Sequence, residues 1–466
     1  MSKIKRFINT AATYFAGNIL SKLVTFFLIP LYTNKLAPEE YGNYDVGITL
    51  VTLFVSVAFF QIWDGMFRFA FDRDDEKSKY DLIGNAMAVY GLGLVLFIIC
   101  LCVAGIFLDI MFLPFAIVYG VFFALQYMYS FMARVFLKNK LFVFSGTLNT
   151  LTAALCNIFC ILALNMGIES LYLAQILGCL VQISVIEFNL KIIPSLRTCK
   201  LDTSCIKEML KFSIPLCIAT ISYWLLNGYT KLVINQTLGA YENGIYAIAS
   251  SLANTAVIAV NVFQFAWNEM AYMSSKEENR KKFYSDCISL LFSTITFGCA
   301  IVCMGIKLLF PILVGEEYRS SIGVIPILMI GVSANAIAGF LGTLFMTEKK
   351  TTYILLSTLV SAAINICFSG FAAKQYGLEG TVWVLTVSFL ALLIIRIIQL
   401  IKKFQVSVSV KSLISCVSLV LGLIIYEYVN NTLLLVLGIA VFAVLYVLFV
   451  IWSMKLDLKK LLARRK

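Results

Sequence analysis

Fourteen apolar stretches follow one another along the chain, and each is about long enough to cross a bilayer. Hydrophobic residues make up 61% of the sequence and charged residues only 13%, whereas an ordinary soluble domain carries about 25% charged residues. The pattern predicts an all-α membrane protein with 14 transmembrane helices. The expected spans are residues 9–32, 45–70, 81–106, 112–137, 141–166, 169–192, 209–238, 243–272, 284–309, 321–346, 351–374, 378–401, 408–428 and 431–454.

The charges between the spans predict the orientation of the chain in the membrane. Every second connection carries several Lys and Arg residues, whereas the intervening turns hold only Lys35, Arg319 and Lys374. Lys and Arg accumulate in the cytoplasmic loops of membrane proteins. An even number of spans places both termini on the same side, so we expect both to be cytoplasmic.

Composition also narrows the classes of function. The chain has no histidine, and none of its 13 cysteines forms a CxxC pair, so we expect neither a metal site nor a disulfide framework. No phosphate-binding loop of the GxxxxGK[ST] type is present. We therefore expect no cofactor and no enzymatic activity, and any energy for transport has to come from an ion gradient, from the substrate gradient or from consumption of the product.

An internal repeat indicates how the spans are grouped. Residues 36–44, Leu-Ala-Pro-Glu-Glu-Tyr-Gly-Asn-Tyr, recur at 238–246 as Leu-Gly-Ala-Tyr-Glu-Asn-Gly-Ile-Tyr, with Leu, Glu, Gly and Tyr in register. Each copy of the repeat begins with a helix whose N-terminus is expected on the cytoplasmic side, which indicates a parallel repeat about an axis along the membrane normal. We expect an N-terminal lobe at 1–192, a linker at 193–208, a C-terminal lobe at 209–401, and two further helices with a basic tail at 402–466.

These residues resemble a known family. The carriers of the resemblance are Ser21-Lys22-Leu23, Ile29–Thr33, Leu36–Gly42, Arg134 before Lys138, Gly315–Tyr318 and Gly377–Thr381. Together they resemble polysaccharide flippases of the multidrug/oligosaccharidyl-lipid/polysaccharide exporter superfamily. The resemblance implies two lobes around a cationic cavity and alternating access. It also implies a bacterial cytoplasmic membrane and movement of a polyprenyl diphosphate-linked oligosaccharide to the outer leaflet during cell-surface polysaccharide synthesis. A polysaccharide polymerase and other assembly proteins are the partners that this resemblance implies.

Basic residues inside the spans are candidates for binding the diphosphate. A basic residue at the bilayer centre costs roughly 2.5–3.5 kcal/mol to insert, so Lys22 and Lys231 are expected to face a wet cavity. Each follows an Asn one helical turn earlier, Asn18 and Asn227 respectively. The alternative for both lysines is that the side chain reaches to the membrane interface, and this alternative is favoured for Arg134, Lys307 and Arg396.

Arg68 is a third candidate for binding the diphosphate. Asp64 precedes it by four residues, on the same helical face. Charges within membranes commonly pair with one another. An ion pair between Asp64 and Arg68 is therefore favoured over direct contact of Arg68 with substrate.

Amide side chains form a stripe along the eighth expected span. Asn254, Asn261 and Asn268 recur every seven residues, and Gln264 lies beside them. Amides both donate and accept hydrogen bonds, as sugar hydroxyl groups require, although they can equally join helices to one another. Tyr223 is expected to line the cavity, or else to anchor its span at the interface.

Acidic residues inside the spans are candidates for ion coupling. Asp64 and Glu269 are the two proposed here, with Glu187 as a further carboxylate near a cytoplasmic end. An ion-coupled antiporter for drugs or small metabolites from the same superfamily remains an alternative function. A membrane polysaccharide polymerase or an acyltransferase is disfavoured because the chain lacks a long external loop and histidine.

Overall fold

Every element that the structure describes is helical. The computed structural model describes residues 23–73, 75–108, 110–197, 199–257, 267, 280–347, 350–406 and 409–463, and no strand occurs within those ranges. Ten of these helices are long and apolar enough to cross a membrane, or eleven when the bent pair α2 and α3 counts as one span. The all-α membrane fold is confirmed. The count of 14 stays a prediction, because residues 9–22 of the first expected span and residues 258–266 and 268–272 of the eighth lie outside the described residues.

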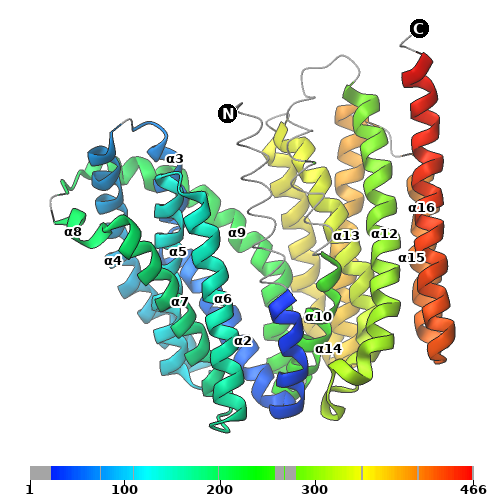
Figure 1. The fold of residues 1–466 in the computed structure, drawn as a ribbon, viewed down its shortest axis with the longest axis horizontal. Helices are drawn as coiled ribbons and strands as arrows, with labels where there is room; N and C mark the ends of the chain where they lie inside the picture. Colours follow the sequence, from blue (N-terminus) through cyan, green and yellow to red (C-terminus); the bar gives the residue numbers. More distant parts are fainter. Residues whose placement is uncertain are drawn as a thin grey trace. The chain divides into compact units, whose positions relative to one another are not determined.

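The chain forms two compact units, Met1–Gly244 and Ile245–Lys466. Residues 23–35 are helical. The helices of the first unit in Figure 1 are α2 Pro38–Ala58, α3 Ile62–Ala70, α4 Glu76–Phe107, α5 Leu113–Val135, α6 Asn139–Leu162, α7 Ile168–Leu190, α8 Ile192–Leu196 and α9 Thr203–Leu238. Helix α9 therefore packs with the first unit, against α2 and α3. The lobe limits expected from the repeat, 1–192, 193–208, 209–401 and 402–466, remain a prediction.

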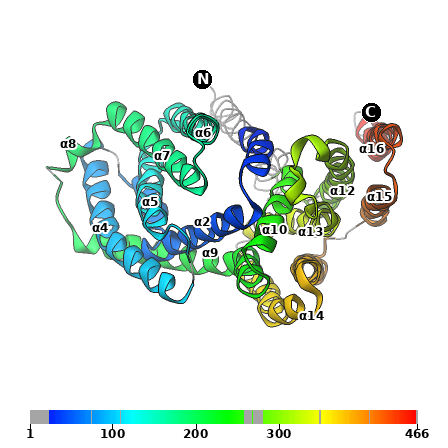
Figure 2. The ribbon, with the colours of Figure 1, turned by 90° about the horizontal axis from the view of Figure 1, so that it is seen from below.

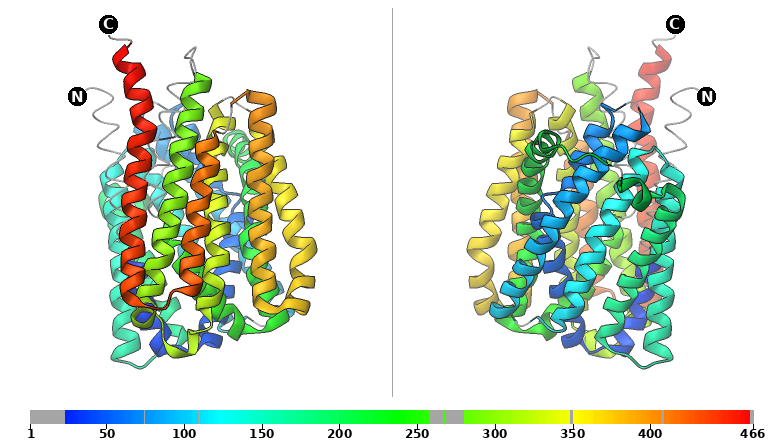
Figure 3. Two further views of the ribbon diagram at one scale, coloured as in Figure 1. Left: turned by 90° about the vertical axis from the view of Figure 1, so that its right-hand side faces the viewer. Right: turned by 90° about the vertical axis from the view of Figure 1, so that its left-hand side faces the viewer.

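The second unit is built from long helices. They are α12 Arg280–Leu313, α13 Ser321–Thr347, α14 Thr351–Gln399, α15 Val410–Tyr428 and α16 Thr432–Ala463, while α10 Ala240–Ala253 crosses the boundary between the units. A short 3-10 helix, Glu316–Tyr318, precedes α13, and a π-helical turn, Leu400–Phe404, follows α14. Helix α12 packs along α15 and α16 (Figure 3). Helix α14 is two helices joined across a kink at Gly377, whose φ of 62° suits glycine.

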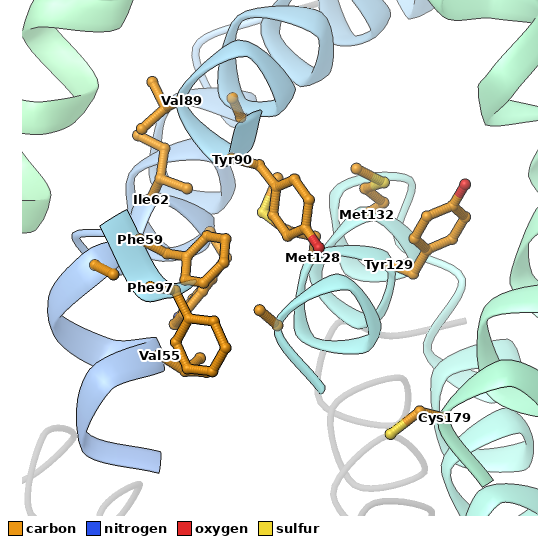
Figure 4. Packing of buried hydrophobic residues seen from close by; sticks show 14 of the residues in the cluster. Val55, Phe59, Ile62, Val89, Tyr90, Phe97, Met128, Tyr129, Met132 and Cys179 are labelled. Carbon is orange, nitrogen blue, oxygen red and sulfur yellow. The ribbon is translucent and has the colours of Figure 1, made fainter. Parts of the chain in front are cut away.

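Helix α5 lies inside the first unit, in contact with α4, α7 and α2 (Figure 2). Aromatic rings fill the space around it. Phe59, which directly follows α2, lies 4.9 Å from Tyr90 and 6.2 Å from Phe97 between ring centroids (Figure 4). Glycines make room for these rings, because a Cβ atom at Gly120 would lie 2.1 Å from the Phe97 ring. Large rings against glycine are a means of close helix packing in membranes.

The second expected span is broken in its middle. Helices α2 and α3 meet at an angle of 51°, and Phe60 and Gln61 at the break have φ values of 52° and 47°. This left-handed region costs roughly 1–3 kcal/mol for a residue other than glycine. Neighbouring groups must satisfy the freed backbone of a broken membrane helix, and α9 supplies them.

Four polar side chains of α9 bond to the broken span at a helical spacing. The Ser213 hydroxyl accepts the Gly65 N–H, the Cys217 thiol donates to the Ser56 carbonyl, Gln61 donates to Thr220 Oγ1 at 2.6 Å, and Trp224 Nε1 donates to the Thr49 carbonyl. Residues 213, 217, 220 and 224 lie on one face of a helix. The break is therefore held in place by a stripe of α9.

The two repeat motifs touch each other through equivalent residues of the first unit. A Cβ atom on Gly42 would lie 1.9 Å from the Ala240 carbonyl oxygen, and one on Gly244 would lie 1.9 Å from the Pro38 carbonyl oxygen. Pro38 and Ala240 occupy the same position in the two motifs. The Asn243 amide also donates to the Gly42 carbonyl at 2.8 Å. The contact is reciprocal, as a two-fold repeat requires, and it explains why both motifs contain glycine.

We predict that Gly42→Ala lowers the free energy of unfolding by about 1–3 kcal/mol, because a methyl group must push two backbones apart. Gly91→Ala is the matched control, since a Cβ atom there meets nothing within 4 Å. The control should be neutral or stabilising by about 0.5–1 kcal/mol, as alanine replaces glycine in a helix. Denaturant titration in detergent micelles measures both, and equal stabilities for the two variants would contradict the close contact.

Candidate functional site

A lysine and an aspartate form an ion pair inside the membrane-spanning part of the first unit. Lys231 of α9 donates to Asp45 of α2 with an Nζ to Oδ1 distance of 2.7 Å. The exposed fractions of the two side chains are 23% and 18%. Since both groups are mostly shielded from solvent, their attraction is weakened less by water than that of a surface pair. The expectation that Lys231 faces a wet cavity stays a prediction.

The aspartate of this pair keeps one oxygen without a partner. Oδ2 of Asp45 is buried and accepts no hydrogen bond from the described residues, and the same holds for the Tyr172 hydroxyl. Tyr172 reaches this region because Gly47 leaves space, as a Cβ atom there would lie 2.2 Å from the Tyr172 hydroxyl oxygen. A buried polar atom without a partner is uncommon. Only Oδ1 of Asp45 therefore has a hydrogen-bond partner among the described residues, and Oδ2 has none.

Several of the predicted site residues lie outside the described residues. They are Lys22, Asn18, Asn261, Gln264, Asn268 and Glu269. The roles expected for them stay predictions.

The predicted residues Asn227, Tyr223 and Asn254 make contacts with residues four positions away in the sequence. Asn227 donates to the Tyr223 carbonyl at 3.4 Å, one turn from Lys231 on α9. Asn254 donates to the carbonyl and hydroxyl oxygens of Ser250 at 2.8 and 3.2 Å. Asn254 and Tyr223 are exposed, whereas Asn227 is half-buried. The roles expected for these three residues in contacting sugar stay predictions.

The expected ion pair between Arg68 and Asp64 is wrong. Arg68 pairs instead with Asp72, at 3.2 Å, and both side chains are about half exposed at 53% and 55%. Residues four apart in either direction are neighbours on a helix, and Asp72 lies at the solvated end, where the guanidinium keeps its contact with water. Asp64 is more buried and lies in the field of Arg134.

Two cations expected to reach an interface are held by neighbouring helices. Arg396 is only 6% exposed and donates to Ser357, Thr358 and the Ala338 carbonyl, which joins α13 to both halves of α14. Lys307 of α12 donates to the Tyr426 and Glu427 carbonyls at the end of α15, where a helix terminus favours a cation. Both therefore hold helices together.

Glu187, considered above as a coupling carboxylate, has a structural role. It accepts the N–H groups of Ile192 and Ile193 at 3.2 and 3.0 Å, and the Tyr129 hydroxyl at 3.1 Å. It therefore caps the short helix α8. Within the described ranges, no three His, Cys, Asp or Glu side chains come together as a metal site would require.

A series of aromatic rings runs through the first unit from the ion pair. Successive centroids lie 5.0–6.4 Å apart. The rings, in order, are Tyr44, Tyr172, Tyr119, Phe123, Tyr127 and Trp63. The series begins next to Asp45 and ends next to Asp64. We call it the ring series.

Sequence reasoning missed Asp45 and the ring series. Asp45 stands at the edge of the second expected span, where a carboxylate is expected to lie at the membrane interface. Its position directly after the repeat motif was the one signal in the sequence that could have pointed to it. Its partner lies 186 residues away, and only the packing of α9 on α2 brings the two together.

We predict that a double-mutant cycle on Asp45→Asn and Lys231→Gln gives a coupling energy of about 1–3 kcal/mol, as contacting charges do. The same cycle on Arg68 and Asp72, a pair of about half-exposed side chains, should give about 0.3–0.5 kcal/mol. Denaturant unfolding in detergent measures both cycles. Similar coupling in the two pairs would show that the Lys231 contact is an ordinary surface pair.

Comparison with known proteins agrees with this architecture. Residues 8–268 match the family described as "Polysaccharide biosynthesis protein". The capsular polysaccharide biosynthesis protein CapF of Staphylococcus aureus is 22% identical over 412 residues, covering 81% of this chain and 96% of CapF.

Solved structures show the same fold. The lipid II flippase MurJ in an inward closed conformation superposes with a TM-score of 0.68 at 14% identity, covering 96% of this chain and 99% of MurJ. An inward-facing multidrug resistance MATE family transporter of the MOP superfamily gives a TM-score of 0.64 at 11% identity, covering 88% and 96%. The family match spans more than half of the sequence, so this chain belongs to the polysaccharide biosynthesis protein family.

Proposed function

We propose that this protein flips a polyprenyl diphosphate-linked oligosaccharide from the cytoplasmic to the outer leaflet of a bacterial cytoplasmic membrane. Family membership and the fold shared with MurJ support a membrane transporter for polysaccharide synthesis. The single observation that carries the proposal is the Lys231–Asp45 pair, an ammonium group within the bilayer region that remains 23% exposed and is held by one carboxylate oxygen.

The chemistry of such a substrate explains why a protein is needed. The polyprenyl tail is soluble in hydrocarbon, whereas the diphosphate and the sugars cannot enter it without a large loss of hydration. A flippase has to replace that hydration with cations for the phosphates and with donors and acceptors for the hydroxyl groups. No chemical bond is formed or broken, so the protein is a transporter and not an enzyme.

Lys231 suits the phosphate role because its present partner can be exchanged. A diphosphate brings more negative charge than Asp45 and offers several acceptor oxygens, so it can displace the carboxylate from the ammonium group. Asp45 then loses its counter-ion, which favours closing the pair again once the phosphate has left. In this mechanism the ion pair resets the empty transporter.

The remaining predicted residues are assigned within the same mechanism. Lys22 and Arg68 are the further phosphate contacts. The groups proposed for the sugars are amides and one tyrosine: Asn18, Asn227, Asn254, Asn261, Gln264, Asn268 and Tyr223. Asp64 and Glu269 are the proposed ion-coupling carboxylates.

The repeat provides the proposed conformational change. A parallel repeat suits alternating access, in which one arrangement opens to the cytoplasm and the other to the outside. Both termini are placed in the cytoplasm by the basic loops. A polysaccharide polymerase is the proposed consumer of the flipped lipid.

We predict that Lys231→Ala and Lys22→Ala slow the flipping of a defined lipid-linked glycan in liposomes. A hydrogen bond to a charged group is worth about 1.5–3 kcal/mol, so each loss should slow flipping about ten- to hundredfold. Lys77→Ala is the control, because Lys77 is an exposed lysine in the first turn of α4.

The assay also separates the alternatives. Unchanged flipping in both variants would remove the lysines from the mechanism. Drug efflux without any glycan transfer by the native protein would favour the multidrug or small-metabolite antiporter instead.

A further inference from the structure

Arg134 stands at the opposite end of the first unit from the Lys231–Asp45 pair. It is the penultimate residue of α5, which runs from the end where α2 begins to the end where α6 begins. Its guanidinium carbon lies 4.3 Å from the centroid of Phe67, 4.7 Å from that of Phe131 and 5.8 Å from that of Phe142. Arg134 therefore sits in an aromatic cage contributed by α3, α5 and α6.

The cage supplies no hydrogen-bond acceptor. In the part of the chain that the structure describes, Nε of Arg134 is buried without a partner, and no carboxylate lies within ion-pair distance of this guanidinium. Arg68, Lys307 and Arg396 all donate to oxygen atoms. Asp64 contributes its field to Arg134 but no ion pair.

Such an arrangement is suited to an anionic ligand. A cation–π contact attracts the guanidinium and fixes its plane, but it leaves the N–H groups unfilled, and a buried donor without an acceptor costs about 1–3 kcal/mol. The planar fork of arginine fits the oxygens of a phosphate in a bidentate manner. Arg134 is also only partly buried, so a ligand can approach it.

We propose that Arg134, held by Phe67 and Phe131, is a second phosphate-binding site of this transporter, at the end of the first unit where α5 meets α6. The inference rests on the proposed function and adds a site to it. The basic loops place this end in the cytoplasm, where a diphosphate-linked substrate arrives. The Lys231–Asp45 pair lies toward the other end of the same unit.

The ring series connects the two sites. It runs from Tyr44, beside Asp45, to Trp63, one helical turn before Phe67 of the cage. Asp45 and Phe67 are separated by 22 residues of α2 and α3, or on the order of 30 Å at 1.5 Å per residue. Tyr127 of this series is 39% exposed, so part of it is available for contact with sugar rings.

Binding of farnesyl diphosphate to the purified full-length protein tests the inference. The protein is placed in nanodiscs of zwitterionic phosphatidylcholine, and titration calorimetry gives the dissociation constant. We expect Arg134→Gln to bind about tenfold more weakly or worse, the loss of one charge-assisted contact. Arg134→Lys should restore only part of the affinity, since it keeps the charge and loses the planar fork. Arg319→Gln is the control, because Arg319 is an exposed arginine that pairs with Glu316 and has no role in the proposed mechanism.

A variant of the aromatic cage shows whether weaker binding results from the lost contact or from loss of folding. Phe131→Leu keeps Arg134 and its charge but removes one ring, and it should weaken binding while the thermal unfolding temperature in the nanodisc stays near that of the native protein. Native affinity in both Arg134→Gln and Phe131→Leu would overturn the inference.

Further arms separate this inference from the proposed function. If Lys231→Gln weakens binding and Arg134→Gln does not, the second site is wrong while the proposed function stands. If the native protein does not bind farnesyl diphosphate, both are contradicted. If the effect of Arg134→Gln disappears in nanodiscs that contain anionic phosphatidylglycerol, the site belongs to phospholipid head groups and the assignment to substrate is overturned.

Discussion

The structure depends on one constraint: inside a bilayer, each polar or charged group has to find its partner within the protein. Arg396 meets this constraint through three side-chain and backbone oxygens of α13 and α14, and the broken span α2–α3 meets it through the polar stripe of α9. These groups already have hydrogen-bond partners within the protein. Asp45, Tyr172 and Arg134 are among the described residues that keep a buried polar atom without a partner, and we propose that a substrate interacts with the sites that contain Asp45 and Arg134.

The two functional proposals follow from that difference. Lys231 has a partner that a phosphate can replace, and Arg134 has aromatic partners that leave its donors free. Both lie in the first unit, at opposite ends, with rings between them. A transporter that hands a diphosphate from one cation to the next avoids a single deep binding site, from which release would be slow.

The sequence predicts the features that depend on neighbouring residues, but it does not predict contacts between helices that are distant in the sequence. The apolar segments, the motifs at 36–44 and 238–246 and the membrane-spanning position of Lys231 could be read from composition, spacing and periodicity. The partner of Arg68 was assigned to the wrong neighbour, because positions 64 and 72 are equally close on a helix and only packing decides which one is solvated. Asp45 and the cage of Arg134 depend on helices that meet far apart in sequence, and no local pattern encodes such contacts.

The most direct test of the central claim is a structure of the full-length protein in a lipid nanodisc with a bound polyprenyl diphosphate-linked glycan, determined by electron cryo-microscopy. We predict density for the diphosphate at the Lys231 ammonium group or at the Arg134 guanidinium, with Asp45 released from Lys231 in the first case. A diphosphate bound at neither cation, with the Lys231–Asp45 pair intact, would contradict it.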